Sequence, residues 1–323
     1  MASFGLGLVL GACTCEEDKP APVPFPTHVA DESHTPREVI DSEQTASAEP
    51  KLLYVPDAAV ELPSAAPTET LPIGPVTRCP ADMVDVRGQF CIDRYEDTLV
   101  DIAEARVVSP YYAPTFFQTQ SAYKTWDKLR HDFGTPEVQL LPLPEPPSFQ
   151  LQGNFDIRAV SKRGVTPNGY LSGILAERAC HNAHKRLCTE LEWVTACRGE
   201  ADQQFPYGPD YQSGKCNVFN GAHPALLLHG NASEGHLDPR LNYFEHHGAP
   251  LLHVTGASPE CKSRWGNDAV YDMVGNLDEW IADEGGVFLG GFYARNTREG
   301  CASRISAHPR GYFDYSLGVR CCD

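Results

Sequence analysis

Histidines are the first residues in this chain whose type and spacing could do chemistry. Six of them lie in the stretch 223–253, including the adjacent His246 and His247, and His181 and His184 lie three residues apart. Imidazole nitrogens bind zinc, copper or iron, so either group could form a metal site. Because the stretch has no recognisable ligand spacing, surface histidines on a loop are the more common explanation for such a cluster.

Cysteines are the second such group, with twelve in 323 residues against three methionines. Cysteines in this number indicate an oxidising compartment, where they pair as disulfides. Cys79 and Cys91 flank two short apolar runs joined by a glycine-containing turn. This pattern predicts a β-hairpin that the two cysteines cross-link.

The N-terminus indicates export. Phe4 to Leu10 is an apolar run that is far too short to span a bilayer, so it does not predict a transmembrane helix. The run ends in Leu10-Gly-Ala-Cys13, which is similar to the lipobox at which bacterial signal peptides are cut and the cysteine is lipidated. We expect residues 1–15 to be a signal segment with Cys13 as the lipidation site. One alternative is an ordinary secretory signal, and another is an apolar segment in which Cys13 and Cys15 are incidental thiols. We expect the protein in the bacterial cell envelope, lipid-anchored or secreted.

Residues 16–75 have the composition of a disordered linker. They hold eleven of the 27 prolines, with twelve acidic residues and three basic ones, and so carry −9 of the net charge of −17. Such a segment cannot bury enough apolar surface to offset its ordering entropy. One folded domain, residues 76–323, then remains. Because no basic stripe is present in the chain, nucleic acid is excluded as a partner, and we expect membrane contact only through a lipid anchor.

The elements of this domain are clearest in its middle. Residues 104–165 are expected to be irregular, with one helix near 119–131. Ser172 precedes a run with helical spacing, and Thr189 begins a capping box with the glutamate three residues on, so two short helices are predicted there. Beyond Gly199 helical periodicity disappears, and we expect short strands and ordered loops.

Four motifs in this region resemble, in the same order, those of the formylglycine-generating enzyme (sulfatase-modifying factor) family. Residues 179–199 resemble the family's A-x-C-x-W-x-G-K-R-L-P-T-E-x-E-W-E-x-x-x-R-G segment, residues 205–208 its Y-P-W-G, residues 270–280 its L-Y-D-M-V-G-N-V-W-E-W, and residues 317–321 its terminal G-F-R-C. The resemblance implies the formylglycine-generating-enzyme fold. This is an α+β fold, related to C-type lectins, with little regular secondary structure and, in this chain, many disulfides.

The resemblance also implies how the cysteines pair. It implies the disulfides Cys180–Cys321 and Cys197–Cys301, in addition to the hairpin bond between Cys79 and Cys91. The four cysteines left in the domain can close two more bonds. For these we expect Cys216–Cys261 and Cys188–Cys322, although sequence alone leaves connectivity open.

A structural calcium site is implied at the third motif. Members of the family use a side chain at the position of Asp272, backbone carbonyls at Gly275 and Leu277, and the carboxylate at Glu279. A turn with two carboxylates and a glycine between them suits a hard cation, which prefers several oxygen ligands. The alternative is that Asp272 and Glu279 only cap a turn and a short helix.

The copper chemistry of the family is not expected. Its aerobic members bind Cu(I) through two cysteines and oxidise a cysteine of a C-x-P-x-R sulfatase peptide to formylglycine, and thiolates are the ligands that Cu(I) prefers. Between Tyr293 and Gly300, where those thiols would lie, this chain has no cysteine, and Arg295 stands at the first thiol position. The sequence therefore predicts no bound copper.

Two functions remain. The first is a binding or scaffolding module for a protein or glycan ligand in the cell envelope, with a groove lined by Tyr293, Arg295, Arg298 and Arg304. The second is a diverged oxidase that still converts a sulfatase cysteine to formylglycine with another metal set, such as the histidine cluster. The loss of the thiol pair favours the first.

Overall fold

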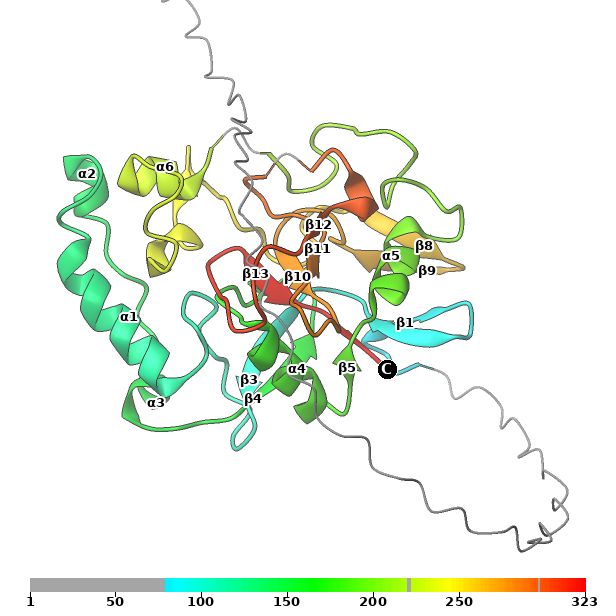
Figure 1. The fold of residues 1–323 in the computed structure, drawn as a ribbon, viewed down its shortest axis with the longest axis horizontal. Helices are drawn as coiled ribbons and strands as arrows, with labels where there is room; N and C mark the ends of the chain where they lie inside the picture. Colours follow the sequence, from blue (N-terminus) through cyan, green and yellow to red (C-terminus); the bar gives the residue numbers. More distant parts are fainter. Residues whose placement is uncertain (1–78, 220–221, 296) are drawn as a thin grey trace, which may run out of the picture. The chain divides into compact units, whose positions relative to one another are not determined.

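The fold is described from a computed structural model, which places residues 79–219, 222–295 and 297–323 (Figure 1). The expectations for residues 1–15 and for the linker 16–75, Cys13 included, fall outside these ranges. The helices are α1 (Phe116–Leu129), α2 (Pro136–Gln139), α3 (Ser148–Gln152), α4 (Gly173–Asn182), α5 (Glu190–Arg198) and α6 (Pro224–His229), with 3-10 turns η1 (Pro239–Leu241) and η2 (Gly300–Ala302).

The strands are short and form several small sheets. They are β1 (Met83–Val86), β2 (Phe90–Asp93), β3 (Asp97–Asp101), β4 (Ile157–Ser161), β5 (Arg186–Leu187), β6 (Glu245–His246), β7 (Ala249–Pro250), β8 (Lys262–Trp265), β9 (Asp268–Tyr271), β10 (Asp278–Trp280), β11 (Phe288–Leu289), β12 (Arg304–Ile305), β13 (Leu317–Val319) and β14 (Cys321–Cys322). Two sheets have four strands, in the orders β1-β2-β14-β5 and β12-β11-β10-β13, and β3-β4, β6-β7 and β8-β9 are separate pairs. The predicted mixture of helices with little regular secondary structure is confirmed.

Three local predictions are confirmed. The strands β1 and β2 form the expected antiparallel hairpin. Helix α4 begins after Ser172, whose side chain accepts a hydrogen bond from the backbone N–H of Leu175. Helix α5 begins with the predicted capping box, in which the side chains of Thr189 and Glu192 each bind the other's backbone N–H. Each of these signals lies within a few residues of the chain, so the sequence is sufficient to specify it.

The prediction for residues 104–165 is wrong in part. The one expected helix is present as α1, but α2, α3 and β4 also form there. Strand β4 pairs antiparallel with β3, from Asp97 opposite Ser161 to Asp101 opposite Ile157, and α4 packs on β4. About 55 residues separate the two strands, so the local pattern did not show the pairing.

The core consists of three clusters of buried apolar side chains. One lies around Trp193 of α5 and takes side chains from β1 and β8. A second lies around Trp280 of β10 and includes one face of α4. The third lies around Tyr293 and Tyr315, beside α6. In Figure 1, β10 and β13 lie near the middle of the domain, with α1, α2 and α6 on one side and α5, β8 and β9 on the other.

Five disulfides cross-link this small amount of regular structure. They join Cys79 to Cys91, Cys180 to Cys321, Cys188 to Cys322, Cys197 to Cys301, and Cys216 to Cys261. These are the five pairs expected from the sequence. Two of them link the C-terminal strand β14 to α4 and to the residue after β5. The end of the chain is therefore covalently fixed in its sheet.

The loop from α6 to β6 is held by a buried ionic group. Asp238, which is fully buried, accepts hydrogen bonds from Arg240 through Nε and Nη2, and His229 Nε2 lies 3.2 Å from its carboxylate. Arg240 is 1 % exposed and also donates to the carbonyl of Val138 at the end of α2. The ring of His229 packs against Trp126 of α1. One carboxylate thereby fixes the loop against α1 and α2.

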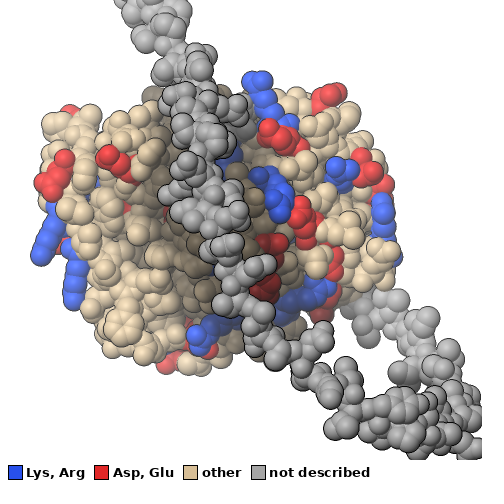
Figure 2. Space-filling model, viewed as in Figure 1, with Lys and Arg blue, Asp and Glu red and all other residues tan. Residues whose placement is uncertain are grey.

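No helix in the part of the chain that the structure describes is long and apolar enough to cross a membrane. On the face of the domain shown in Figure 2, basic and acidic side chains are interspersed.

Replacing Asp238 by alanine should destabilise the fold by about 3 kcal/mol, because it leaves the Arg240 guanidinium buried without a counter-charge. Urea denaturation of the full chain measures this. Asp210→Ala, at an exposed aspartate, is the matched control and should change the free energy of unfolding by less than about 0.5 kcal/mol. Equal effects of the two substitutions would show that Asp238 does not hold the loop.

Candidate functional site

The turn between β9 and β10 carries the residues expected to hold calcium. Its backbone adopts left-handed conformations at Asp272, Gly275 and Asn276, with φ of 60°, 84° and 61°. A Cβ at Gly275 would lie 2.3 Å from the carbonyl oxygen of Asn217, so only glycine fits there. The carboxylate of Asp272 accepts a 2.6 Å hydrogen bond from the backbone N–H of Gly256. The turn is therefore fixed by contacts with distant segments.

Asn276 organises this turn. Its amide nitrogen donates to Glu96, and its amide oxygen accepts from Asn217 and from the backbone N–H of His253. Glu96 also accepts from the backbone N–H of Leu277. Segments near residues 96, 217 and 253 thus meet at one side chain.

Glu279 is bound to a buried arginine. Both of its carboxylate oxygens accept from the guanidinium of Arg320, at 2.8–3.1 Å, and one of them accepts from the indole N–H of Trp193 at 2.6 Å. Glu279 and Arg320 are 1 % and 0 % exposed. The guanidinium also donates to the backbone carbonyls of Asp93 and Tyr271.

The charge around this arginine fits a further cation. Glu96, Asp272 and Glu279 are buried and close enough for their charges to interact, and Arg320 neutralises one of the three. Burial raises the pKa of Asp272 to about 7, and burial together with the charges of Asp272 and Glu279 raises the pKa of Glu96 well above its usual range. A divalent ion would relieve this excess of negative charge.

The set of side-chain ligands for such an ion is less complete than the charge of the surrounding carboxyl groups suggests. Glu279, one of the two expected carboxylate ligands, is already occupied by Arg320 and Trp193. Asp272 would therefore be the main side-chain ligand of a calcium ion, with the carbonyls of Gly275 and Leu277 beside it. The alternative that Asp272 and Glu279 only cap a turn does not describe Glu279, whose partners lie far along the chain.

An ion pair occupies the position of the family's first copper thiol. The guanidinium of Arg295 lies 3.0 Å from the carboxylate of Asp278 and stacks over the ring of Phe292. Arg295 has 30 % of its side chain exposed and Asp278 1 %. Asp278 stands where the family motif has its first tryptophan. The two residues that differ from the family here, Asp278 and Arg295, are therefore in contact with each other. Burial raises the pKa of Asp278 to about 7, and Arg295 counteracts this by stabilising the carboxylate.

The groove expected from Tyr293, Arg295, Arg298 and Arg304 does not form as a set. Tyr293 is fully buried, and its hydroxyl bonds to Leu241 and Asn242 inside the core, so it lines no surface groove. Arg304 pairs with Glu190 at the start of α5. Arg298 is exposed. The three arginines therefore have separate environments.

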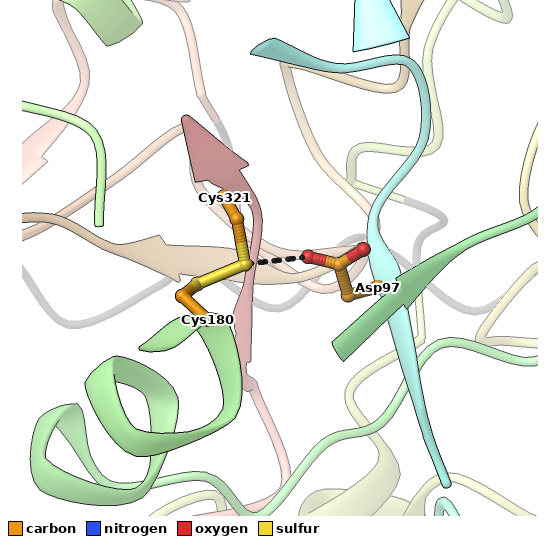
Figure 3. Close-up of side chains that lie close together, drawn as sticks. All are labelled: Asp97, Cys180 and Cys321. Carbon is orange, nitrogen blue, oxygen red and sulfur yellow. Dashed lines mark hydrogen bonds between the residues drawn. A yellow bond between two sulfur atoms is a disulfide. The ribbon is translucent and has the colours of Figure 1, made fainter. Parts of the chain in front are cut away.

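The cysteines offer no thiol pair within the described residues, because all ten are in disulfides. In the described ranges one group of three potential ligand side chains lies within metal-binding distance, namely Asp97, Cys180 and Cys321. Figure 3 shows that the two sulfurs of this group are bonded to each other, with Asp97 Oδ2 3.2 Å from the sulfur of Cys321. It is a carboxyl group packed on a disulfide and not a metal site.

Asp97 belongs to a second buried acidic group, outside the calcium turn. Burial raises the pKa of Asp97 well above its usual range, and the nearby negative charge of Asp93 raises it further. Burial also raises the pKa of Asp93 to about 6, against the opposing effect of Lys185, which bonds to both Asp93 and Asp82. Desolvation raises the pKa of the half-exposed Asp82, but the hydrogen bond and the positive charge of Lys185, together with smaller effects of its own backbone and of Arg94, outweigh it, so the pKa is lowered.

The histidines do not assemble a metal site among the residues that the structure places. No three ligand side chains that include a histidine lie together there. His223 bonds to the hydroxyl of Tyr315 and His236 to the carbonyl of Ala232, His229 Nε2 lies 3.2 Å from the carboxylate of Asp238, and His246 and His247 pack on each other. The surface or packing interpretation therefore fits better than a metal cluster.

Four residues of this region were not expected as site residues. Arg320 belongs to the terminal motif, Asn276 and Asp278 stand on either side of Leu277 in the third motif, and Glu96 follows strand β2. Their partners lie 13 to 227 positions away along the chain. The motifs gave no sign of this pairing.

Comparisons with known proteins agree with the motifs. A family model described as the sulfatase-modifying factor enzyme 1-like domain matches residues 161–323, half of the chain. A formylglycine-generating enzyme of Thermomonospora curvata is 30 % identical over 105 residues, which cover 31 % of this chain and 28 % of that enzyme. The alignment thus spans less than a third of that relative's length.

Two solved structures show a weaker likeness. PvdO from Pseudomonas aeruginosa and CarF each match at 15 % identity with a TM-score of 0.33. The matches cover 72 % of this chain, and 79 % of PvdO and 85 % of CarF. These values are too low to add to the family match.

The buried carboxyl groups with raised pKa values, those of the second acidic group among them, should make the protein more stable at pH 5 than at pH 8. Because the pKa values of Asp93 and Asp97 are raised in the folded state, the folded protein binds more protons than the unfolded chain above about pH 4, and stability is lost as pH rises through the folded-state pKa values. The expected loss is on the order of 2 kcal/mol, measured by urea denaturation at a series of pH values.

Asp97→Asn removes the buried proton site and should flatten this profile by raising stability at pH 8 more than at pH 5. Asp210→Asn, at an exposed aspartate, is the control and should leave the profile unchanged. A wild-type protein that gains stability between pH 5 and pH 8 would contradict the assignment.

Proposed function

Because this chain belongs to the sulfatase-modifying factor enzyme 1-like domain family, we propose that it uses the family's fold as a binding module and lacks the copper-dependent oxidase activity. The observation that carries this proposal is the ion pair of Arg295 with Asp278 at the first thiol position. A guanidinium cannot ligate Cu(I), which requires soft ligands such as thiolates. A scaffold without that chemistry retains its surfaces and cavities for a protein or glycan ligand.

The cysteine pairing supports the same proposal. Each of the ten cysteines in the described residues has a disulfide partner, so no reduced pair is available in the folded domain. Five disulfides also support export, since such bonds persist in oxidising compartments. We extend the proposal to a place in the bacterial cell envelope, with Cys13 as the lipid attachment site.

A bound calcium ion is the second part of the proposal. Three buried carboxyl groups, those of Glu96, Asp272 and Glu279, interact near the turn between β9 and β10 with the single guanidinium of Arg320 beside them, and the resemblance assigns the carbonyls of Gly275 and Leu277 as further ligands. The ion would stabilise this turn and would take no part in a reaction. It would reduce the mutual repulsion of Asp272, Glu96 and Glu279.

The relative from Thermomonospora curvata favours the alternative, a diverged formylglycine-generating oxidase, because that protein is named for this activity. The shared stretch covers 28 % of that enzyme's length, so the comparison alone does not show that this chain has the same activity. A direct assay separates the two functions.

The assay combines a thiol count with a test for oxidation. Under denaturing, non-reducing conditions the full chain should react with at most two equivalents of a thiol reagent, at Cys13 and Cys15, and the double variant Cys13→Ser/Cys15→Ser should not react. With Cu(I), oxygen and a C-x-P-x-R peptide, mass spectrometry should detect no formylglycine. The Thermomonospora curvata enzyme is the positive control. A reactive pair among the ten domain cysteines, or formylglycine in the peptide, would refute the proposal.

Calcium should raise the melting temperature of the chelator-treated protein by about 5 °C at a hundredfold excess over Kd, since binding to the folded state alone adds about 3 kcal/mol there. Asp272→Asn should abolish most of this shift, because the main side-chain ligand loses its charge. Asp210→Asn should keep it. If wild-type protein shows no shift with millimolar calcium, the site does not bind this ion.

A further inference from the structure

A small cavity lies where α1 meets the part of the chain that matches the family model. Its volume is about 160 Å³, and eleven residues line it. Some of them belong to α1 and the segment just before it, and others, such as Tyr170 and Phe313, belong to the matched residues 161–323. Since α1 lies outside the matched range, the cavity depends on a segment that the family model does not include.

Aromatic rings form one part of the wall. Tyr112, Trp126 and Tyr170 line the cavity and are buried to 1 %, 8 % and 2 % exposure. The hydroxyl of Tyr112 donates to the carbonyl of Pro144, and that of Tyr170 to the carbonyl of Asp238. These bonds fix both rings, so the apolar wall is formed before any ligand binds.

Polar residues of α1 also contribute to the lining. Gln118, Ser121 and Thr125 line the cavity at spacings of three and four residues, which places them on one face of the helix. The hydroxyl of Thr115 donates to the amide oxygen of Gln118, and the amide hydrogens remain available to a ligand. Ser121 and Thr125 are exposed. This row therefore presents two hydroxyl groups and one amide to the cavity.

The lining excludes charged ligands. None of the eleven residues is Asp, Glu, Lys, Arg or His. A carboxylate or phosphate would lose its hydration there without gaining a counter-charge. The volume corresponds to about five water molecules, which is the size of one six-membered ring with its substituents and smaller than a drug-sized site.

We propose that this cavity binds one neutral pyranose ring of a glycan. A pyranose has an apolar C–H face, which packs on aromatic rings, and hydroxyl groups at its edge, which bond to side chains such as Gln118, Ser121 and Thr125. A proline ring of similar size would make no hydrogen bond with this polar row. The inference rests on the proposed binding function and names its ligand class.

The experiment uses the full chain and four neutral probes, the methyl pyranosides of glucose, galactose, mannose and N-acetylglucosamine, together with glucuronic acid and tetraproline. Saturation-transfer difference NMR detects binding, and titration gives Kd. At least one neutral pyranoside should bind with Kd on the order of 1 mM, the affinity expected of so small a ligand. Glucuronic acid and tetraproline should bind at least tenfold more weakly.

Substitutions in α1 locate the site. Ala122→Phe fills the cavity and should abolish binding. Ser121→Ala/Thr125→Ala removes two hydroxyl groups at exposed positions and should raise Kd at least threefold without lowering the melting temperature. Lys124→Ala, on the same helix but outside the cavity lining, is the control and should bind as wild type.

The inference is overturned if no neutral pyranoside binds, if binding survives Ala122→Phe, or if tetraproline binds in their place and is lost on that substitution. These results are independent of the oxidase assay. If no sugar binds, the proposed binding function still stands, but its ligand is not a pyranose. Formylglycine formation, in contrast, would refute the proposed function but leave the cavity and its measured ligand unchanged.

Discussion

The buried pair of Arg320 with Glu279 is the interaction on which most of the domain depends. Arg320 precedes the C-terminal strand β14, and its guanidinium contacts Glu279 of β10 and the backbone of Asp93 and Tyr271 at the ends of β2 and β9. Glu279 in turn accepts from Trp193 of α5. The guanidinium therefore joins the C-terminal segment to β2, β9 and β10, and Glu279 extends this contact to α5. Because both charges are fully buried, loss of either partner leaves the other without compensation, which is far more costly than loss of the pair as a whole.

This arrangement explains how a domain with such short strands remains ordered. The sheets supply few backbone hydrogen bonds, so other links must restrict the chain. Three of the five disulfides join residues more than 100 positions apart, which strongly reduces the entropy of the unfolded chain. Two of the three attach β14 directly beside Arg320, at Cys321 and Cys322. Covalent and ionic links thus hold the same segment.

The departures from the family motif are local and leave this framework intact. Asp278 and Arg295 replace a tryptophan and a copper ligand, and they pair with each other beside the turn that Asn276 organises. Neither residue takes part in the contacts of Arg320 with Glu279, Asp93 and Tyr271 that link the elements of the scaffold. The segment before the family match adds α1, and α1 completes the aromatic cavity. The proposed ligand site therefore lies partly on a segment outside the family match and away from Asp278 and Arg295.

The sequence by itself determined the family scaffold, the helix caps at Ser172 and Thr189 and the disulfide of the opening hairpin. Caps are contacts between residues three apart. The family motifs implied the disulfides Cys180–Cys321 and Cys197–Cys301, whereas sequence alone left the connectivity of the other four cysteines open. Only the tertiary structure decided the pairing of β3 with β4, the burial of Tyr293 and the partners of Arg320. Those depend on which distant groups share one low-dielectric interior, where a charge is stable only beside its partner. Residue types indicate which groups could make such contacts, but the packing of distant segments decides which of them do.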